Sequence, residues 1–322
     1  MTDGEITRFM NELVEGRLAE DAIVRTLTDL RARGESAADL LEAARVMRAK
    51  CVSVSTPFAN LLDTCGTGGD ALGTVNASTL AALIAASAGA RVAKHGNRSV
   101  SGLFGSADLL ESFGIRVELS PAEVAQSIEK TGFGFMFAPL FHPAMKHAAA
   151  ARKKIEGKTL FNCLGPLTNP AGAKRHLLGV YDDRLVEPVC EALKTLGAVH
   201  AIVVHGHGGM DEISLSGPTR VAELESGTIR VYTAFPLEFG IRPAPLSALV
   251  CASREEAARA ARAVVEAAEG PQTDFVILNA AFALKAAGIA STPLAGVERA
   301  RGLLKTGMVR AKIEEIRKLF PR

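Results

Sequence analysis

From residue 61 onward, short apolar segments alternate with longer segments that have the apolar spacing of helices. Short buried strands separated by helices are typical of a largely parallel sheet covered on both faces, so the sequence predicts an α/β fold. Ligands of such sheets bind beyond the carboxyl ends of the strands. The predicted strands cover 60–62, 91–93, 116–119, 133–138, 177–180 and 201–204, and the predicted helices cover 80–88, 105–114, 253–268, 273–287 and 293–306, with a further helix beginning at Pro121.

The first 50 residues have a different pattern, with helical spacing throughout. Ile6 and Leu13 belong to one apolar stripe, and Ser36 with Asp39 has the pattern of a capping box. Residues 51–57 form a linker that ends at a proline. Because each helix has only one apolar stripe, we expect a small helical unit that packs on the rest of the chain or serves as an oligomer contact.

Composition limits the class of protein. Of the 322 residues, 48% are hydrophobic and 22% are charged, as expected for a soluble protein with a core. The net charge of +2 provides no global field for nucleic acid or membrane. Five scattered cysteines without a C-x-x-C pair favour free thiols in a reducing cytoplasm. The first residues lack a signal-peptide pattern, and no apolar run reaches the roughly 18 residues of a membrane span.

A glycine-rich loop, with Gly66, Gly68 and Gly69 followed by Asp70, lies between the first predicted strand and a predicted helix. Glycines let backbone N–H groups approach an anion closely, and a helix N-terminus adds unpaired N–H groups and partial positive charge. The loop lacks the Gly-Lys-Ser/Thr of a P-loop and is not G-x-G-x-x-G. It therefore indicates either a phosphate-binding loop or a tight turn.

Two polar clusters follow other predicted strands. Residues 94–98 contain Lys94, His95, Asn97 and Arg98, which suits phosphate binding but also a solvated basic turn. Residues 205–212 end in the adjacent acids Asp211 and Glu212, which suit Mg²⁺ but are also common on surfaces. His205 and His207 lack the spacing of a helical zinc site, and we expect them in a loop. Because polar clusters follow three of the predicted strands, we expect one site built from several loops.

The segment 142–152 predicts one helix that begins at Pro143. His142 lies just before the proline, and Arg152 is too far along the helix to contact the same atom, although both can line one cleft. These spacings do not predict a Ser/His/Asp triad.

Together, the motifs resemble those of the anthranilate phosphoribosyltransferase family, over nearly the whole chain. The resemblance implies a helical domain at 1–63, to which the segment at about 165–185 returns, and an α/β domain at 64–322 with a central, mostly parallel sheet flanked by helices. It also implies a cleft between the domains and a homodimer formed through the helical domain. The motifs are Gly66-Thr67-Gly68-Gly69-Asp70, Lys94-His95-Gly96-Asn97-Arg98, His142-Pro143-Ala144-Met145, the run from Phe161 to Pro170, and Asp211-Glu212-Ile213-Ser214.

The resemblance further implies transfer of a phosphoribosyl group from phosphoribosyl diphosphate to the amine of anthranilate, in tryptophan biosynthesis. Mg²⁺, two ions per monomer, would be held by Ser78, Asp211 and Glu212. His95 and His142 are the candidates for proton transfer. Carried over by position, the donor site comprises Gly66, Gly69, Asp70, Thr74, Asn76, Ser78, Thr79, Lys94 and Ser106, and the anthranilate site comprises Gly66, His95, Asn97, His142, Arg152 and Gly165.

The sequence departs from the family pattern at three positions. Leu103 and Phe104 stand where a basic and a small polar residue are common, near the phosphates, and Lys158 stands where Arg is usual. Two other functions are compatible with parts of the pattern: a pyrimidine nucleoside phosphorylase, and a non-catalytic paralogue that binds nucleic acid. The acidic pair argues against the first, and the intact glycine loop with low net charge argues against the second.

Overall fold

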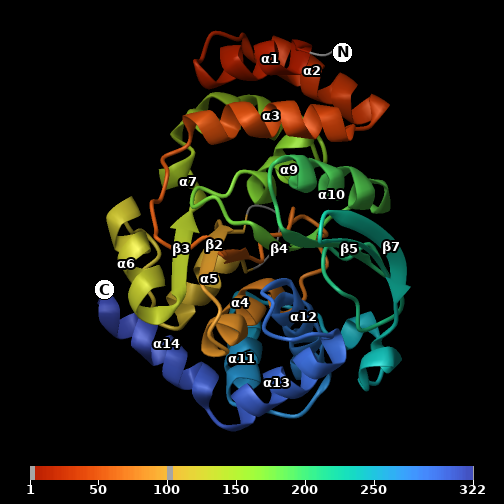
Figure 1. The fold of residues 1–322 in the computed structure, drawn as a ribbon. Helices are drawn as coiled ribbons and strands as arrows, with labels where there is room; N and C mark the ends of the chain where they lie inside the picture. The colour runs from red at the N-terminus through yellow and green to blue at the C-terminus, as the bar shows by residue number, and fades with distance from the viewer. Residues whose placement is uncertain (1–3, 100–103, 322) are drawn as a thin grey trace.

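The computed structural model describes residues 4–99 and 104–321 (Figure 1). Three helices come first: α1 (Glu5–Val14), α2 (Glu20–Arg33) and α3 (Ala37–Lys50). The predicted capping box at the start of α3 is confirmed, because the Ser36 hydroxyl accepts from the Asp39 N–H at 3.2 Å and Asp39 Oδ2 accepts from the Ser36 N–H at 2.8 Å. The predicted apolar stripes are also confirmed, since Ile6 and Leu13 are fully buried.

One seven-stranded sheet forms the centre of the molecule, in the order β3-β2-β1-β4-β5-β6-β7. The first five strands of the chain are parallel, and β6 and β7 are antiparallel to their neighbours. The predicted α/β class is therefore confirmed. The strands are β1 (Leu62–Asp63), β2 (Val92–Gly96), β3 (Phe133–Phe137), β4 (Arg175–Gly179), β5 (His200–Gly206), β6 (Thr219–Glu225) and β7 (Thr228–Ala234).

Helices cover both faces of this sheet (Figure 1). They are α4 (Ala77–Ser87), α5 (Ser106–Ser112), α6 (Pro121–Thr131), α7 (Ala138–Phe141), α8 (Ala149–Lys154), α9 (Leu160–Leu167), α10 (Val186–Thr195), α11 (Arg254–Val265), α12 (Pro271–Ala286), α13 (Pro293–Lys305) and α14 (Met308–Leu319), with the 3₁₀ helices η1 (Pro143–Ala148), η2 (Asp183–Leu185), η3 (Pro236–Phe239) and η4 (Leu246–Ala248).

Successive strand residues point to opposite faces and enter different cores. Leu177 and Ile202 pack with α4 and α11–α14, whereas Leu178 and Val203 pack with α9, α10 and the three N-terminal helices. The second core thus contains residues from both proposed domains. The boundary between a helical domain at 1–63 and an α/β domain at 64–322 therefore stays a prediction.

The structure corrects three expectations. Residues 116–119 are not a strand: Val117 and Leu119 are buried, but they pack under neighbouring helices and have no ladder partner, and β3 is the edge strand. The segment after His142 is not one helix but η1 followed by α8, and η1 packs against α1. His205 is not a loop residue, because β5 continues through it to Gly206.

The β6–β7 hairpin was not predicted from the sequence. Its turn is Ser226-Gly227, and both residues have positive φ, 50° and 77°, as a type I′ turn requires. A Ser-Gly pair between two alternating segments was the available signal. Within the described residues, no helix combines the length and the apolar character needed to cross a membrane.

Candidate active site

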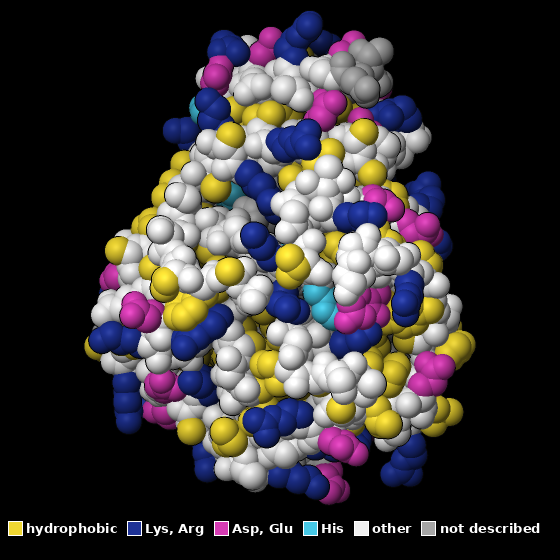
Figure 2. Space-filling view, viewed as in Figure 1, with side chains coloured by type: hydrophobic (Ala, Val, Ile, Leu, Met, Phe, Trp, Pro, Cys, Tyr) yellow, Lys and Arg dark blue, Asp and Glu magenta, His cyan; other side chains and the backbone are white. Residues whose placement is uncertain are grey.

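A cavity of about 850 Å³ lies between the N-terminal side of the molecule and the carboxyl ends of β1, β2, β4 and β5. Met47 of α3, together with η1, α8 and α9, forms one wall, and the glycine loop with the starts of α4 and α5 forms the other. Figure 2 shows Lys and Arg side chains along the middle of the face below the N-terminal helices. Every site residue predicted from the sequence lines this cavity except Thr79, whose side chain is fully buried.

The glycine loop packs against the ends of β4 and the 211–212 loop. The Thr67 N–H donates to the Gly179 carbonyl at 2.9 Å, and the Gly68 N–H donates to Asp211 Oδ2 at 2.7 Å. Gly68 and Gly69 have φ of +66° and +85°, in the left-handed region that glycine adopts without steric cost. The glycine loop is therefore more than a tight turn, because it holds the 211–212 loop at the cavity through the bond between Gly68 and Asp211.

The start of α4 faces the same cavity. Asn76 is its N-cap, and its Oδ1 accepts from the Thr79 N–H at 3.0 Å. The backbone N–H of Ser78 donates to Glu212 Oε1 at 3.1 Å. Thr74, Asn76 and Ser78 thus lie at the cavity surface, while Thr79 is one step deeper, where its hydroxyl has no partner among the described residues.

Lys94 and His95 lie on β2 itself rather than in a loop after it. The Lys94 ammonium is buried and donates to the Thr64 carbonyl at 3.2 Å and the Thr64 hydroxyl at 3.1 Å. Burial lowers the pKa of Lys94, and the nearby Asp63 opposes that shift. Lys94 is therefore already engaged by groups of the protein.

Asp63 and Asn169 join β1, β2 and the end of α9, and sequence analysis had given neither of them a role. Asp63 Oδ1 accepts from the backbone N–H groups of Cys65 at 3.0 Å and His95 at 3.2 Å, and Oδ2 accepts from Asn169 Nδ2 at 2.6 Å. Burial raises the pKa of Asp63 to about 6, although Lys94 and these hydrogen bonds oppose the change. In the sequence, the only indication of this role was the position of Asp63 at the end of a predicted apolar strand.

The two candidate histidines lie side by side, with ring centroids 4.9 Å apart. His95 Nδ1 is 2.8 Å from the Gly165 carbonyl oxygen, which makes that nitrogen the protonated one, while Nε2 is buried without a partner among the described residues. Burial lowers the pKa of His95 to about 3 and that of His142 to about 4. Both rings are therefore neutral at pH 7.

The carboxylates of Asp70, Asp211 and Glu212 also line the cavity. Burial raises the pKa of Asp211 to about 7, and the negative charge of Asp70 contributes to the shift. The pKa of Glu212 is also raised, by burial and then by Asp211. Neighbouring carboxylates raise each other's pKa when no cation nearby compensates their negative charges. Carboxylate oxygens are also the ligands that suit Mg²⁺. The residues present therefore fit a divalent cation.

A second acidic group lies at the amino-terminal end of β5, where His200, Glu223 and Glu225 have ligand atoms within 4.8 Å of one another. Glu223 there accepts from the Tyr232 hydroxyl at 2.9 Å, and its carboxylate is 2.5 Å from Lys285 Nζ. His200 and Glu223 are thus satisfied by protein partners, Glu225 is exposed, and none of the three lines the cavity.

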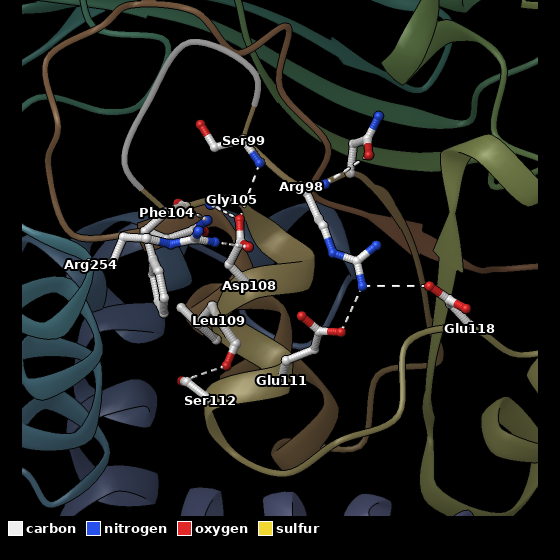
Figure 3. Close-up of polar contacts among 12 residues, drawn as sticks. Arg98, Ser99, Phe104, Gly105, Asp108, Leu109, Glu111, Ser112, Glu118 and Arg254 are labelled. Atoms are coloured by element: carbon white, nitrogen blue, oxygen red, sulfur yellow. Dashed lines mark hydrogen bonds and ion pairs between the residues drawn. The ribbon is translucent and has the colours of Figure 1, made fainter. Parts of the chain in front are cut away.

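Asn97 and Ser106 both line the cavity. Asp108 of α5 holds the backbone of Ser99 and Gly105, which lie between them in the sequence (Figure 3). Asp108 Oδ2 accepts from the Ser99 N–H at 3.1 Å and the Gly105 N–H at 2.9 Å, and Oδ1 accepts from the Arg254 guanidinium. The Phe104 ring packs against the apolar core. Leu103, which also departs from the family pattern, lies outside the described residues.

Arg152 reaches the cavity from α8, on the same wall as His142. Its side chain is exposed, and its guanidinium carbon lies 5.5 Å from the centroid of the Phe161 ring. Gly165 lies within α9, and its carbonyl oxygen accepts from His95 Nδ1. Of the predicted acceptor residues, His142, Arg152 and Gly165 belong to the wall formed by η1, α8 and α9, whereas His95 lies on β2. Gly66 and Asn97 line the same cavity.

Comparison with known proteins agrees with this geometry. The model of the glycosyl transferase family, a/b domain, matches residues 59–310. An anthranilate phosphoribosyltransferase from Nitrosomonas europaea is 46% identical over 97% of this chain and 92% of its own. The crystal structure of that enzyme from Thermus thermophilus has a TM-score of 0.93 and 42% identity, covering 99% of this chain and 95% of that one. The Saccharomyces cerevisiae enzyme in complex with PRPP (phosphoribosyl diphosphate) and Mg has a TM-score of 0.84 and 27% identity, covering 93% and 85%. The chain therefore belongs to the anthranilate phosphoribosyltransferases of the glycosyl transferase family.

Proposed function

We propose that the cavity binds phosphoribosyl diphosphate on its sheet side and anthranilate on its helical side, and that the phosphoribosyl group passes between them. The observation that carries this assignment is that one cavity joins a glycine-rich loop, an acidic pair and a wall with exposed cationic side chains. The products are N-(5-phosphoribosyl)anthranilate and diphosphate, in tryptophan biosynthesis.

On the sheet side, the proposed donor site uses backbone as much as side chains. The glycine loop and the start of α4 can present N–H groups and helix charge to phosphate. The side chains of Asn76, Ser78 and Ser106 line the same wall. Lys94 contributes its charge from below, because its hydrogen bonds go to Thr64. We assign Gly66, Gly69, Asp70 and Thr74 to this site, and Thr79 to its support.

On the helical side, Arg152 is the proposed partner of the anthranilate carboxylate, because a guanidinium binds a carboxylate through two parallel hydrogen bonds. His95, His142, Asn97 and Gly165 line the rest of that path. The amine of anthranilate is neutral at pH 7 and is already a nucleophile. The neutral histidines therefore need only orient the acceptor and exclude water.

The proposed metal ligands are Asp211, Glu212 and Ser78, with two Mg²⁺ ions per monomer. A bound Mg²⁺ supplies positive charge that stabilises the departing diphosphate. In the protein itself, the Gly68 and Ser78 N–H groups hold the two carboxylates in place at 2.7 and 3.1 Å. The number of ions is open to measurement by calorimetric titration of the protein with phosphoribosyl diphosphate present.

We further propose a homodimer formed through the helical unit, and a cytoplasmic location. The five free cysteines support a reducing compartment. The dimer rests on the family resemblance, and sedimentation equilibrium of the full chain, compared with a variant bearing charged substitutions on α1, tests it. We propose no nucleic-acid and no membrane partner.

The assignment of function is tested by the fluorescence of anthranilate, which falls when phosphoribosyl diphosphate and Mg²⁺ are added to an active enzyme. A matched reaction with a pyrimidine nucleoside and phosphate tests the phosphorylase alternative, and a gel shift at physiological salt tests nucleic-acid binding. Loss of anthranilate fluorescence that needs both phosphoribosyl diphosphate and Mg²⁺ supports the proposal. Release of free base in the nucleoside reaction alone contradicts it.

A further inference from the structure

Lys158 lies directly on the glycine loop, although it belongs to the opposite wall of the cavity. A Cβ atom built on Gly69 would be 1.7 Å from Lys158 Nζ, 2.5 Å from its Cε and 3.1 Å from its Cδ. The side chain therefore lies flat on the second left-handed glycine of the loop. Both residues line the active-site cavity, and the Lys158 side chain is half-buried.

The Lys158 ammonium has neither an ion pair nor a hydrogen bond to any residue that the structure describes. Two other cations that line the cavity, Lys94 and Arg98, are engaged by groups of the protein. Lys94 donates to Thr64, and Arg98 pairs with Glu111 at 2.7 Å. Half-buried cations without a partner are unfavourable unless a ligand supplies the counter-charge. Lys158 is thus positioned for an anion at the glycine loop.

The backbone on either side of Lys158 is anchored to the helical side. The Arg31 guanidinium of α2 donates to the Glu156 carbonyl and packs on Gly157. On the other side, the Thr159 N–H donates to Asn162 Oδ1 at 3.1 Å, in the first turn of α9. Lys158 therefore extends from a fixed point on one wall to the anion-binding loop of the other.

We propose that Lys158 binds the diphosphate group of phosphoribosyl diphosphate from the helical side, so that the bound donor connects the two walls of the cavity. This assignment rests on the proposed function. An ammonium is a compact point charge that suits phosphate oxygens. The donor would then be held by backbone N–H groups from below and by Lys158 from above, and the acceptor carboxylate would remain with Arg152.

The test compares Lys158→Met with Lys158→Arg. Methionine keeps an unbranched side chain over Gly69 without the charge, and arginine keeps the charge. The control is Lys154→Ala, which removes the same charge four residues away, from an exposed pair with Glu20. For each variant, calorimetry gives the Kd of phosphoribosyl diphosphate with Mg²⁺ but without anthranilate, and steady-state kinetics give both Michaelis constants.

We expect Lys158→Met to raise the Kd and the Michaelis constant for phosphoribosyl diphosphate by about 10- to 100-fold, the range for loss of a charge-assisted hydrogen bond. The Michaelis constant for anthranilate should change less than about 2-fold, Lys158→Arg should restore most of the affinity, and Lys154→Ala should resemble the wild type. An unchanged Kd in Lys158→Met, with normal binding by the wild type, overturns this assignment alone. A wild-type protein that does not bind phosphoribosyl diphosphate overturns the proposed function as well.

Discussion

Gly179, the last residue of β4, is the position where one added methyl group should most damage the site without touching a ligand. A Cβ atom at Gly179 would lie 1.5 Å from the Asp211 carbonyl oxygen and 2.2 Å from its carbonyl carbon. Ordinary van der Waals contact begins near 3.4 Å, so Gly179→Ala must push the 211–212 loop away by about 2 Å.

This displacement should separate the predicted metal ligands from their supports. The bonds at risk are those from Gly68 N–H to Asp211 at 2.7 Å and from Ser78 N–H to Glu212 at 3.1 Å. Misplacement by about 1 Å can cost about 10²-fold in rate, so we expect turnover to fall at least 10²-fold and the Mg²⁺ concentration for half-activity to rise. The crowding should reduce the free energy of unfolding by about 1–3 kcal/mol.

The matched control is Gly302→Ala in α13, where an added Cβ meets no atom within 4 Å. Alanine is a better helix former than glycine, so this variant should keep full activity and be more stable by up to about 1 kcal/mol. The assay is initial rate against Mg²⁺ concentration, together with urea unfolding followed by circular dichroism. If Gly179→Ala keeps more than half of the wild-type turnover and an unchanged Mg²⁺ dependence, the argument from steric contact is wrong.

Four further predictions concern the residues assigned to the site. Replacement of Asp211 by Asn together with Glu212 by Gln should remove most activity and leave the circular dichroism spectrum unchanged, and full activity of the wild type in excess EDTA would contradict the metal assignment. Arg152→Ala should raise the Michaelis constant for anthranilate and leave that for phosphoribosyl diphosphate nearly unchanged; an equal rise in both would indicate a structural role. His95→Ala and His142→Ala, separately and together, should lower turnover at saturating substrate by no more than about 10²-fold, and a loss above about 10³-fold in either single variant would show that proton transfer dominates. Because both histidines are neutral in the folded protein, with pKa values of about 3 and 4 against 6.5 in the unfolded chain, their contribution to the free energy of unfolding should be constant above about pH 7 and fall as pH decreases from 6.5 toward 4; urea titrations at pH 7.5 and 5 will show this as a loss of stability that is larger in the wild type than in the double histidine variant.

The sequence predicted the elements that depend on local signals. The capping box at Ser36 and the Pro at the start of α6 each act within one turn of the chain, and each begins a helix where expected. The strand predicted at 116–119 was wrong, because the alternation of apolar and polar residues there results from packing under helices and not from pairing with another strand. Local pattern cannot distinguish these two causes.

The residues that sequence analysis missed act through long-range contacts. Asp63 and Asn169 are 106 residues apart and meet at 2.6 Å, and Gly179 is important only because the 211–212 loop folds over it. Lys158 was recognised only as a departure from a family pattern, and its contact with Gly69 depends on how two walls meet. Such roles arise from tertiary packing and have no local signature in one sequence.

The state of the two histidines restricts how this cleft can promote the reaction. A base with a pKa of about 3 or 4 takes a proton poorly from an amine nucleophile, and a ring that is neutral at pH 7 is a weak acid. The harder step is the departure of diphosphate, which leaves positive charge on the ribose carbon. In the proposed arrangement, the carboxylates of Asp70, Asp211 and Glu212 lie on the donor side, and the exposed Arg152 lies on the acceptor side. We therefore infer that positioning and fixed charge, already arranged before substrates enter, lower the barrier, and that proton transfer contributes little.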